Sequence, residues 1–256
     1  MPEDTVYETI DALVARMRDD LAAMQRDGDA RRFFHGTYLR TTEAVAAEIE
    51  RGGFEDGDWL RRWDLAFASL YLDALDADRS GAAVPAPWRV AFGAARARPG
   101  LPPLRHVLFG INAHINYDLP QALLAVISPA DFDNAELSRS RAADHRRLDS
   151  VLAGRVAAED DELDAVSKVT LLDRLLRPAN RAASRRFLAE SREKVWHNAL
   201  VLDRARRDSA ERYDTTLAEL ERLSAARLAD LAAPGPVLLK LARRGFGVLL
   251  PDTATG

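Results

Sequence analysis

Apolar side chains recur at every third or fourth position along most of this chain, and this spacing limits the folds it can adopt. One apolar stripe after Asp58 consists of Leu60, Trp63, Phe67, Leu70, Tyr71 and Ala74. Such spacing places side chains on one face of an α-helix, whereas a strand needs strict alternation. Further helices are expected over residues 3–25, 37–51, 134–159, 162–176 and 180–232, the last with a break near Asp208. Long helices joined by short loops pack as antiparallel bundles, so an all-α fold is predicted.

Length and composition favour a single domain. The chain has 256 residues, of which 47% are hydrophobic and 30% charged, the balance of a globular protein with a sizeable core. We expect N-terminal helices over residues 1–127, long helices over 130–233 and an amphipathic C-terminal helix over 236–250. The basic face of that last helix could lie on a membrane or a partner, but such helices more often dock on their own core. The long C-terminal helices could also support a homo-oligomer.

Charge and cysteine content narrow the possible functions. With 36 Lys and Arg against 40 Asp and Glu, the net charge of −4 gives no general attraction for nucleic acid, and no nucleic-acid partner is expected. The absence of cysteine leaves His, Asp and Glu as the possible metal ligands. The acidic N-terminal residues do not resemble a signal peptide, and no run reaches the roughly 18 to 20 apolar residues of a membrane helix. A cytoplasmic protein without a transmembrane segment is therefore expected.

The stretch HVLFGINAHINYDLP, which begins at His106, places polar side chains among the most apolar residues of the chain. Asn112 and Asn116 are four residues apart, and so are His114 and Asp118. The alternation would suit a half-buried strand, but no other segment offers a convincing partner strand. We therefore predict a helix that carries two polar stripes.

This helix should be central, because no Lys or Arg occurs between Arg105 and Arg139. Burying amides, an imidazole and a carboxylate without partners would cost several kcal/mol in total. The partners could be one another, neighbouring helices, water or a ligand. The letters DLPQ from Asp118 also resemble an N-terminal capping box, so Asp118 could begin a new helix after a break near Pro120.

Several histidines and acids are candidate metal ligands. His114 and Asp118 lie on adjacent helical turns and could hold one ion together. The same spacing recurs at His145 and Asp149, where the neighbouring charges also fit a solvated helix face. Three further candidates occupy expected core positions or loop ends: Asp64, His106 and His35. A histidine satisfied by core neighbours, or a helix cap, would explain the last two equally well.

The chain resembles two known groups of proteins. The segments FFHGTYLRTTEAVAAEI, WLRRWDLAFASLYLDAL, HVLFGINAHINYDLPQALL and SPADFDNAEL are similar to an uncharacterised family of actinobacterial proteins, a domain of unknown function. This resemblance covers nearly the whole chain and implies no activity. More remotely, HINYDLPQALL resembles a motif of the all-helical zinc-dependent phospholipase C and S1/P1 nuclease superfamily, which reads like HYIGDLHQPLH.

The second resemblance implies a metal cluster. Those enzymes carry two His-x-x-x-Asp or Glu pairs, and the interval from His114 to His145 is similar to theirs. It places Asp64, His106 or His35 at the family's upstream ligand positions. The chain departs from the pattern where the superfamily has a further histidine, here Leu124, and it lacks the mature N-terminal Trp ligand. One or two metal ions are therefore implied rather than three.

Two classes of function follow. An enzyme would use zinc or another divalent ion, and no organic cofactor, to hydrolyse a phosphoester. Asp64 and Asp118 would then be the catalytic carboxylates, with Asn112 and Asn116 binding the substrate. The alternative is a non-catalytic helical scaffold, or a small-ligand-binding protein, with a buried structural polar network. Convergence of the candidate ligands on one point would favour the enzyme.

Overall fold

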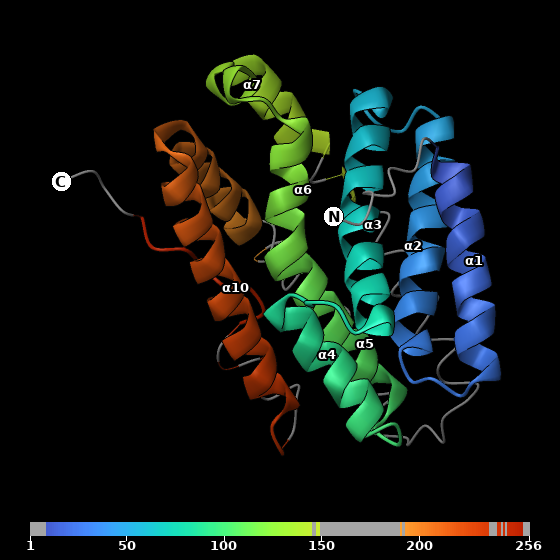
Figure 1. Ribbon diagram of the computed structural model, residues 1–256. Helices are drawn as coiled ribbons and strands as arrows, with labels where there is room; N and C mark the ends of the chain where they lie inside the picture. The colour runs from blue at the N-terminus through green and yellow to red at the C-terminus, as the bar shows by residue number, and fades with distance from the viewer. Residues whose placement is uncertain are drawn as a thin grey trace.

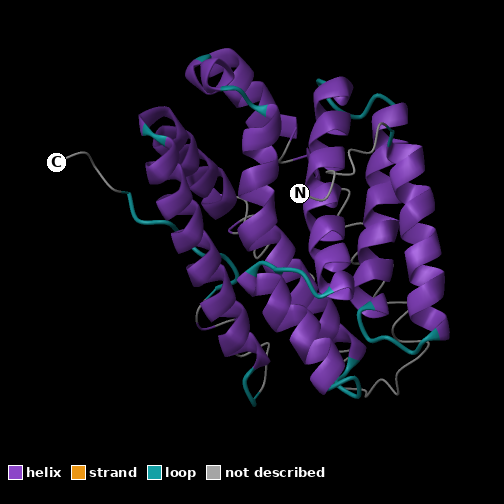
Figure 2. Ribbon diagram, viewed as in Figure 1, coloured by secondary structure: helices purple, strands orange, loops and turns teal. Residues whose placement is uncertain are grey.

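The computed structural model describes residues 9–144, 147–148, 190, 193–235, 240–241, 243 and 245–252. In these residues every regular element is a helix and no strand is present (Figure 2). The helices stand side by side, with α1 at one edge of the bundle and α10 at the other (Figure 1). The predicted all-α fold is confirmed.

The described elements follow the expected order along the chain. They are α1 (Ile10–Arg26), α2 (Arg32–Glu50), α3 (Gly57–Ser80), α4 (Ala86–Ala97), α5 (Pro103–Ala113), the π-helix η1 (His114–Asp118), α6 (Leu119–Val126), α7 (Pro129–Asp133) and α10 (Ala210–Ala232). Residues 135–144 and 193–208 are also helical. The predicted break near Asp208 is confirmed, because Ser209 begins α10 by accepting a hydrogen bond from the Arg212 N–H at 3.0 Å.

Helix α3 lies between α2 and α6 (Figure 1) and packs against both. The apolar stripe predicted for it is largely buried, with Leu60 and Tyr71 fully shielded from solvent. The helix begins earlier than predicted, because Asp56 rather than Asp58 caps it. Oδ1 of Asp56 accepts a hydrogen bond from the Trp59 N–H at 2.9 Å, which satisfies one of the free donors of the first turn.

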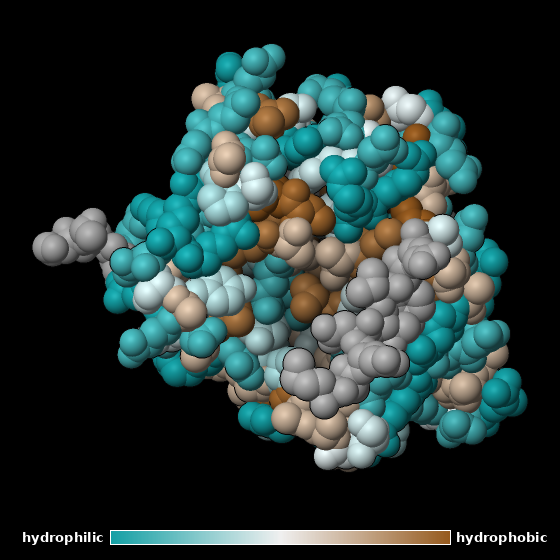
Figure 3. All heavy atoms as spheres, turned by 45° about the horizontal axis from the view of Figure 1, so that its top comes forward, coloured by the Kyte–Doolittle hydropathy of each residue, from teal (hydrophilic) through white to brown (hydrophobic). Residues whose placement is uncertain are grey.

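Polar and apolar residues are separated over the bundle surface. Seen from the end where α7 lies, apolar side chains gather toward the centre of the face and hydrophilic ones toward its rim (Figure 3). Such separation is what the hydrophobic effect produces in a packed helical domain. Among the described helices, none is long and apolar enough to cross a membrane.

The prediction of a helix over residues 236–250 is wrong for its last part. The Gly245 N–H donates to the Leu241 carbonyl at 2.8 Å, and Gly245 has a φ of +70°. This left-handed conformation suits glycine and ends the helical turn. The residues after it are not helical. Residues 245–252, called the C-terminal segment below, instead pair with side chains of the bundle.

Candidate functional site

The stretch from His106 to Pro120 forms one continuous helical rod, in which α5 passes through η1 into α6. The Leu119 N–H donates to the His114 carbonyl, the i→i−5 pattern of a π-helix. Proline has no N–H, and the wider π turn carries the chain across it without a break. Asp118 has helical φ and ψ of −78° and −37°, and its side chain makes no capping hydrogen bond. The predicted break and capping box are therefore wrong.

The polar residues of the rod divide between two sets of partners, as their spacing predicted. Asn112 and Asn116 both donate from Nδ2 to the Phe246 carbonyl, each at 3.2 Å. His114 and Asp118 contact each other and the aromatic core instead. The amides predicted to bind a substrate thus hold the C-terminal segment.

His114 and Asp118 form a buried pair. Nδ1 of His114 lies 2.8 Å from Oδ2 of Asp118, and their exposures are 3% and 1%. The same oxygen accepts a hydrogen bond from Nε1 of Trp88, on α4, at 2.8 Å. Asp118 therefore fixes the orientation of the imidazole ring, and Trp88 fixes Asp118.

Aromatic rings surround the imidazole of His114. The Phe67 ring stacks on it at 3.6 Å between centroids, with 5° between the planes. The Tyr38 ring meets it edge-on at 4.5 Å. Three more rings have centroids within 6.1 Å of it: Phe34, Tyr71 and Trp88. These five rings, called the aromatic box below, come from α2, α3 and α4.

The aromatic box disfavours charge on the pair inside it. Burial lowers the pKa of His114 well below its usual value and raises the pKa of Asp118 well above its usual value. The Trp88 N–H opposes the second shift by stabilising the carboxylate. At neutral pH the pair therefore keeps a proton between its two members and carries no net charge.

Three buried polar atoms near the aromatic box lack a hydrogen bond of normal geometry within the described residues. They are Nε2 of His114, the Tyr38 hydroxyl and Oδ2 of Asp64. Burial raises the pKa of Asp64 to about 7. It also raises the pKa of Tyr38, and the nearby carboxyls of Asp64 and Asp118 add to that shift. A buried carboxyl without a cation is most stable in its protonated form.

The predicted metal ligands do not gather in the part of the chain that the structure describes. No group of three or more His, Asp or Glu side chains there is placed to hold a metal ion. His114 and Asp118 are brought together, but His35 and His106 have separate neighbours. His145 and Asp149 lie outside the described residues. A four-ligand centre at Asp64, His106, His114 and Asp118 is therefore not formed.

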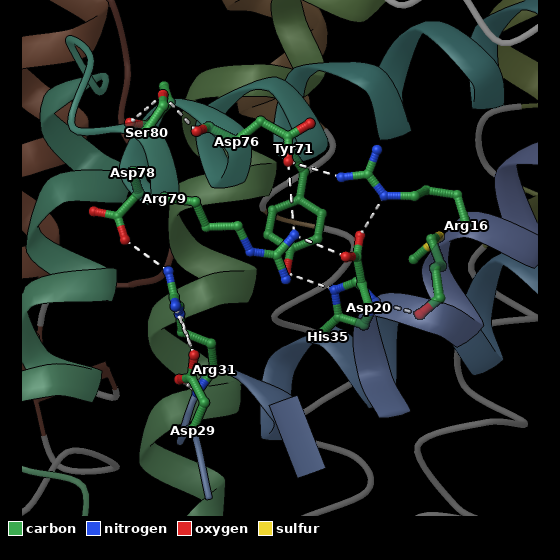
Figure 4. A network of polar contacts seen from close by, with 12 residues as sticks. Arg16, Asp20, Asp29, Arg31, His35, Tyr71, Asp76, Asp78, Arg79 and Ser80 are labelled. Atoms are coloured by element: carbon green, nitrogen blue, oxygen red, sulfur yellow. Dashed lines mark hydrogen bonds and ion pairs between the residues drawn. The ribbon is translucent and has the colours of Figure 1, made fainter. Parts of the chain in front are cut away.

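His35 is a fully satisfied core histidine. Its Nε2 lies 2.8 Å from the Met17 carbonyl, and its Nδ1 lies 2.8 Å from the Tyr71 hydroxyl. A carbonyl can only accept, so Nε2 carries the proton and Nδ1 accepts from Tyr71. Figure 4 shows the ring beside the ion pairs that Asp20 makes with Arg16 and Arg79, at 2.8 and 2.7 Å. Neither nitrogen of His35 is free to bind a metal.

His106 lies at a small pocket instead. Its ring stacks on Phe33 at 5.8 Å, and neither nitrogen has a hydrogen-bond partner of normal geometry among the described residues. The pocket, which Tyr71 and Trp88 also line, offers about 20 Å³, room for about one water molecule. Burial lowers the pKa of His106, so the ring is neutral at neutral pH.

Sequence reasoning missed four residues of these networks: Tyr38, Trp88, Asp144 and Asn198. Tyr38 and Trp88 read as ordinary core aromatics, because their partners lie on other helices. Asp144 is fully buried and accepts from the N–H groups of Glu55 and Asp56 at 2.9 and 3.0 Å, but it sits in a charged run that suggested a solvated face. Nothing in the sequence distinguishes Asn198 from a surface amide.

Comparison with known proteins gives a family and no activity. No curated protein and no solved structure matches the chain. The resemblance to the phospholipase C and nuclease superfamily therefore gains no support. Residues 10–234 match a family described as a family of unknown function, DUF5995. That match spans most of the sequence, and the chain belongs to this family.

Proposed function

We propose that this protein acts by binding rather than by catalysis, and that the polar residues of its central helical rod are structural. The observation that carries this proposal is the set of partners these residues have. Asn112 and Asn116 hold the main chain at Phe246, while His114 holds Asp118. Each side chain satisfies another part of the same molecule, which is how buried polar groups are normally stabilised.

The space around the His–Asp pair supports the same proposal. Phe67 covers one face of the imidazole at van der Waals distance, and Tyr38 lies against it. The pocket on the other side of Trp88 offers room for about one water molecule. Ligand sites for drug-sized molecules measure about 300 to 1,000 Å³. A phosphoester substrate would need the aromatic box to open before it reached Nε2 of His114.

Metal analysis tests the proposal directly. We expect purified protein to hold less than about 0.1 equivalent of zinc or any other divalent transition metal, because the described residues supply no third ligand. Treatment with EDTA should leave the melting temperature unchanged. Stoichiometric metal that is lost in His114→Asn and retained in His35→Asn would contradict the proposal.

A metal-dependent phosphoester hydrolase is the second candidate, and one observation favours it. Nε2 of His114 has no hydrogen-bond partner among the described residues, while Asp118 orients the ring through Nδ1. Carboxylates orient zinc-bound histidines in this way. Asp64 could add an oxygen ligand, but the described residues offer no complete ligand set, so no catalytic step is derived. The metal analysis above decides between the two candidates.

A further inference from the structure

The C-terminal segment is held by side-chain amides that bind its main chain. Asn116 makes two such bonds: Nδ2 donates to the Phe246 carbonyl at 3.2 Å, and Oδ1 accepts from the Val248 N–H at 3.2 Å. Asn198, from the helical residues 193–208, repeats the pattern one step along. Its Nδ2 donates to the Val248 carbonyl at 3.1 Å, and its Oδ1 accepts from the Leu250 N–H at 2.8 Å.

This arrangement reads the chain as a neighbouring β-strand would. The two amides engage main-chain groups two residues apart, the repeat of an extended chain. Asn112 donates to the Phe246 carbonyl as well, and Nε2 of His197 lies 3.0 Å from the Leu250 carbonyl. The three residues Asn112, Asn116 and Asn198 are called the asparagine clamp below. All three are buried, so the clamp is part of the core and not a surface feature.

Side chains of the C-terminal segment alternate in burial. Phe246, Val248 and Leu250 are 6%, 8% and 1% exposed, whereas Leu249 is 52% exposed. Main-chain bonds to alternate residues supply affinity, and pockets for alternate side chains supply specificity, in domains that bind extended peptides. The clamp and the apolar positions beside it have both features.

We propose that the asparagine clamp is a binding site for an extended peptide of another protein, and that the C-terminal segment is the resident ligand which that peptide displaces. The peptide would carry three apolar residues at alternate positions, as Phe246, Val248 and Leu250 do. Its main chain would take over the bonds to Asn116 and Asn198. These bonds do not depend on which side chains the peptide carries, so a foreign segment can make them equally well.

Two observations show that the clamp and its occupant are separable. The family match over residues 10–234 includes all three asparagines and ends before the C-terminal segment begins. The segment is also joined to the bundle at a hinge, since Gly245 adopts a φ of +70° directly before it. The residues that leave the clamp therefore need not carry the rest of the fold with them.

A peptide from another protein fits these contacts better than exchange of this segment between two copies of the chain. Lys240 fastens the preceding residues to the end of α10, because its Nζ donates to the Asp230 and Ala233 carbonyls at 2.6 and 2.9 Å. Exchange between copies would have to pull these residues away. Displacement needs only the residues after Gly245 to leave.

The test uses a fluorescein-labelled peptide with the sequence of residues 245–252, GFGVLLPD, and the full chain. In the variant Phe246→Asp/Leu250→Asp the resident segment should leave the clamp, because two carboxylates would replace buried apolar groups. We expect the peptide to bind this variant at least 100-fold more tightly than the wild type. In the wild type the tethered segment competes at an effective concentration of about millimolar. Fluorescence anisotropy measures both affinities.

Two controls assign the binding to the clamp. Adding Asn198→Ala to the double variant should weaken peptide binding at least tenfold. A peptide with the Val248→Asp change should not bind. A double variant that is folded by circular dichroism but does not bind the peptide overturns the proposal. So does a dimer in which cross-links join the segment of one copy to the 193–208 helix of another.

Hydrogen exchange on the wild-type chain keeps the proposal testable if the double variant does not fold. The Val248 and Leu250 amides should exchange faster than the core amides of α3, and millimolar peptide should speed their exchange further. Exchange at the rate of global unfolding, unchanged by peptide, would overturn the proposal. This inference rests on the proposed binding function, but the metal analysis does not involve the clamp, so either can fail alone.

Discussion

Replacing Gly110 with alanine is expected to lower the free energy of unfolding by about 3 kcal/mol or more, at the upper end of overpacking effects. A Cβ atom built at this position on α5 lies 2.1 Å from Cγ of Phe34 and 2.4 Å from Cδ2. Phe34 cannot move aside easily, because it packs edge-on against Tyr71 at 5.1 Å and stacks with Tyr38 at 5.8 Å. Relief of the clash would have to distort the aromatic box around His114. Urea unfolding followed by tryptophan fluorescence measures the loss.

Gly93→Ala is the matched control for this prediction. Gly93 is a helical glycine of α4 whose added Cβ would meet no atom within 4 Å. Alanine favours the helix over glycine by about 1 kcal/mol, so this variant should be as stable as the wild type or more stable. A Gly110→Ala variant within 0.5 kcal/mol of the wild type, a margin typical of neutral surface changes, would show that Phe34 is free to move. The closed aromatic box would then be incorrect.

The parts of the fold that depend on local spacing were predictable from the sequence. The buried stripe of α3 and the two polar stripes of the central rod follow from the helical period alone. The pairing of His114 with Asp118 is equally local, because residues four apart are neighbours on a helix. These features need no knowledge of which helices lie side by side.

The end of the chain was not predictable from local spacing. Its leucines and basic residues have a helical period, which favours a helix over residues 236–250. In the structure Gly245 stops the turn, and Asn116 and Asn198 then bind main-chain groups that a helix would have used internally. Those bonds join residues more than fifty positions apart, and sequence periodicity carries no information about them.

The candidate site was predictable only in part, for the same reason. A shared spacing suggested that His145 and Asp149 might complete a centre begun by His114 and Asp118, but ligation requires several helices to aim at one point. Trp88 instead reaches Asp118 from α4, and the His35 nitrogens are used by Met17 and Tyr71. Polar residues buried in a core find partners wherever packing brings a donor to an acceptor.

Asp64→Asn is expected to stabilise the protein by about 4 kcal/mol at pH 8 and by almost nothing at pH 4, from the linkage between pKa and folding. Burial raises the pKa of Asp64 from 3.8 to about 7 in the folded state. Between these values the unfolded chain has lost the Asp64 proton while the folded chain retains it, so wild-type stability falls as pH rises. Above about pH 7 the folded protein carries a buried carboxylate, and the penalty is complete. Asparagine has a similar size and cannot ionise, so it removes this penalty.

Urea unfolding of both proteins at pH 4, 6 and 8 isolates this effect, because the difference between them cancels the titration of all other groups. Asp73→Asn is the control, since Asp73 lies on the exposed side of the same helix and its difference from the wild type should stay constant with pH. If Asp64→Asn also gave a constant difference, the Asp64 carboxyl would have an ordinary pKa in the folded protein. If the variant became less stable than the wild type as pH rose, a cation would be holding Asp64 ionised. That result would favour the metal-dependent hydrolase, because a bound metal ion is the one proposed partner that stabilises a carboxylate at this depth.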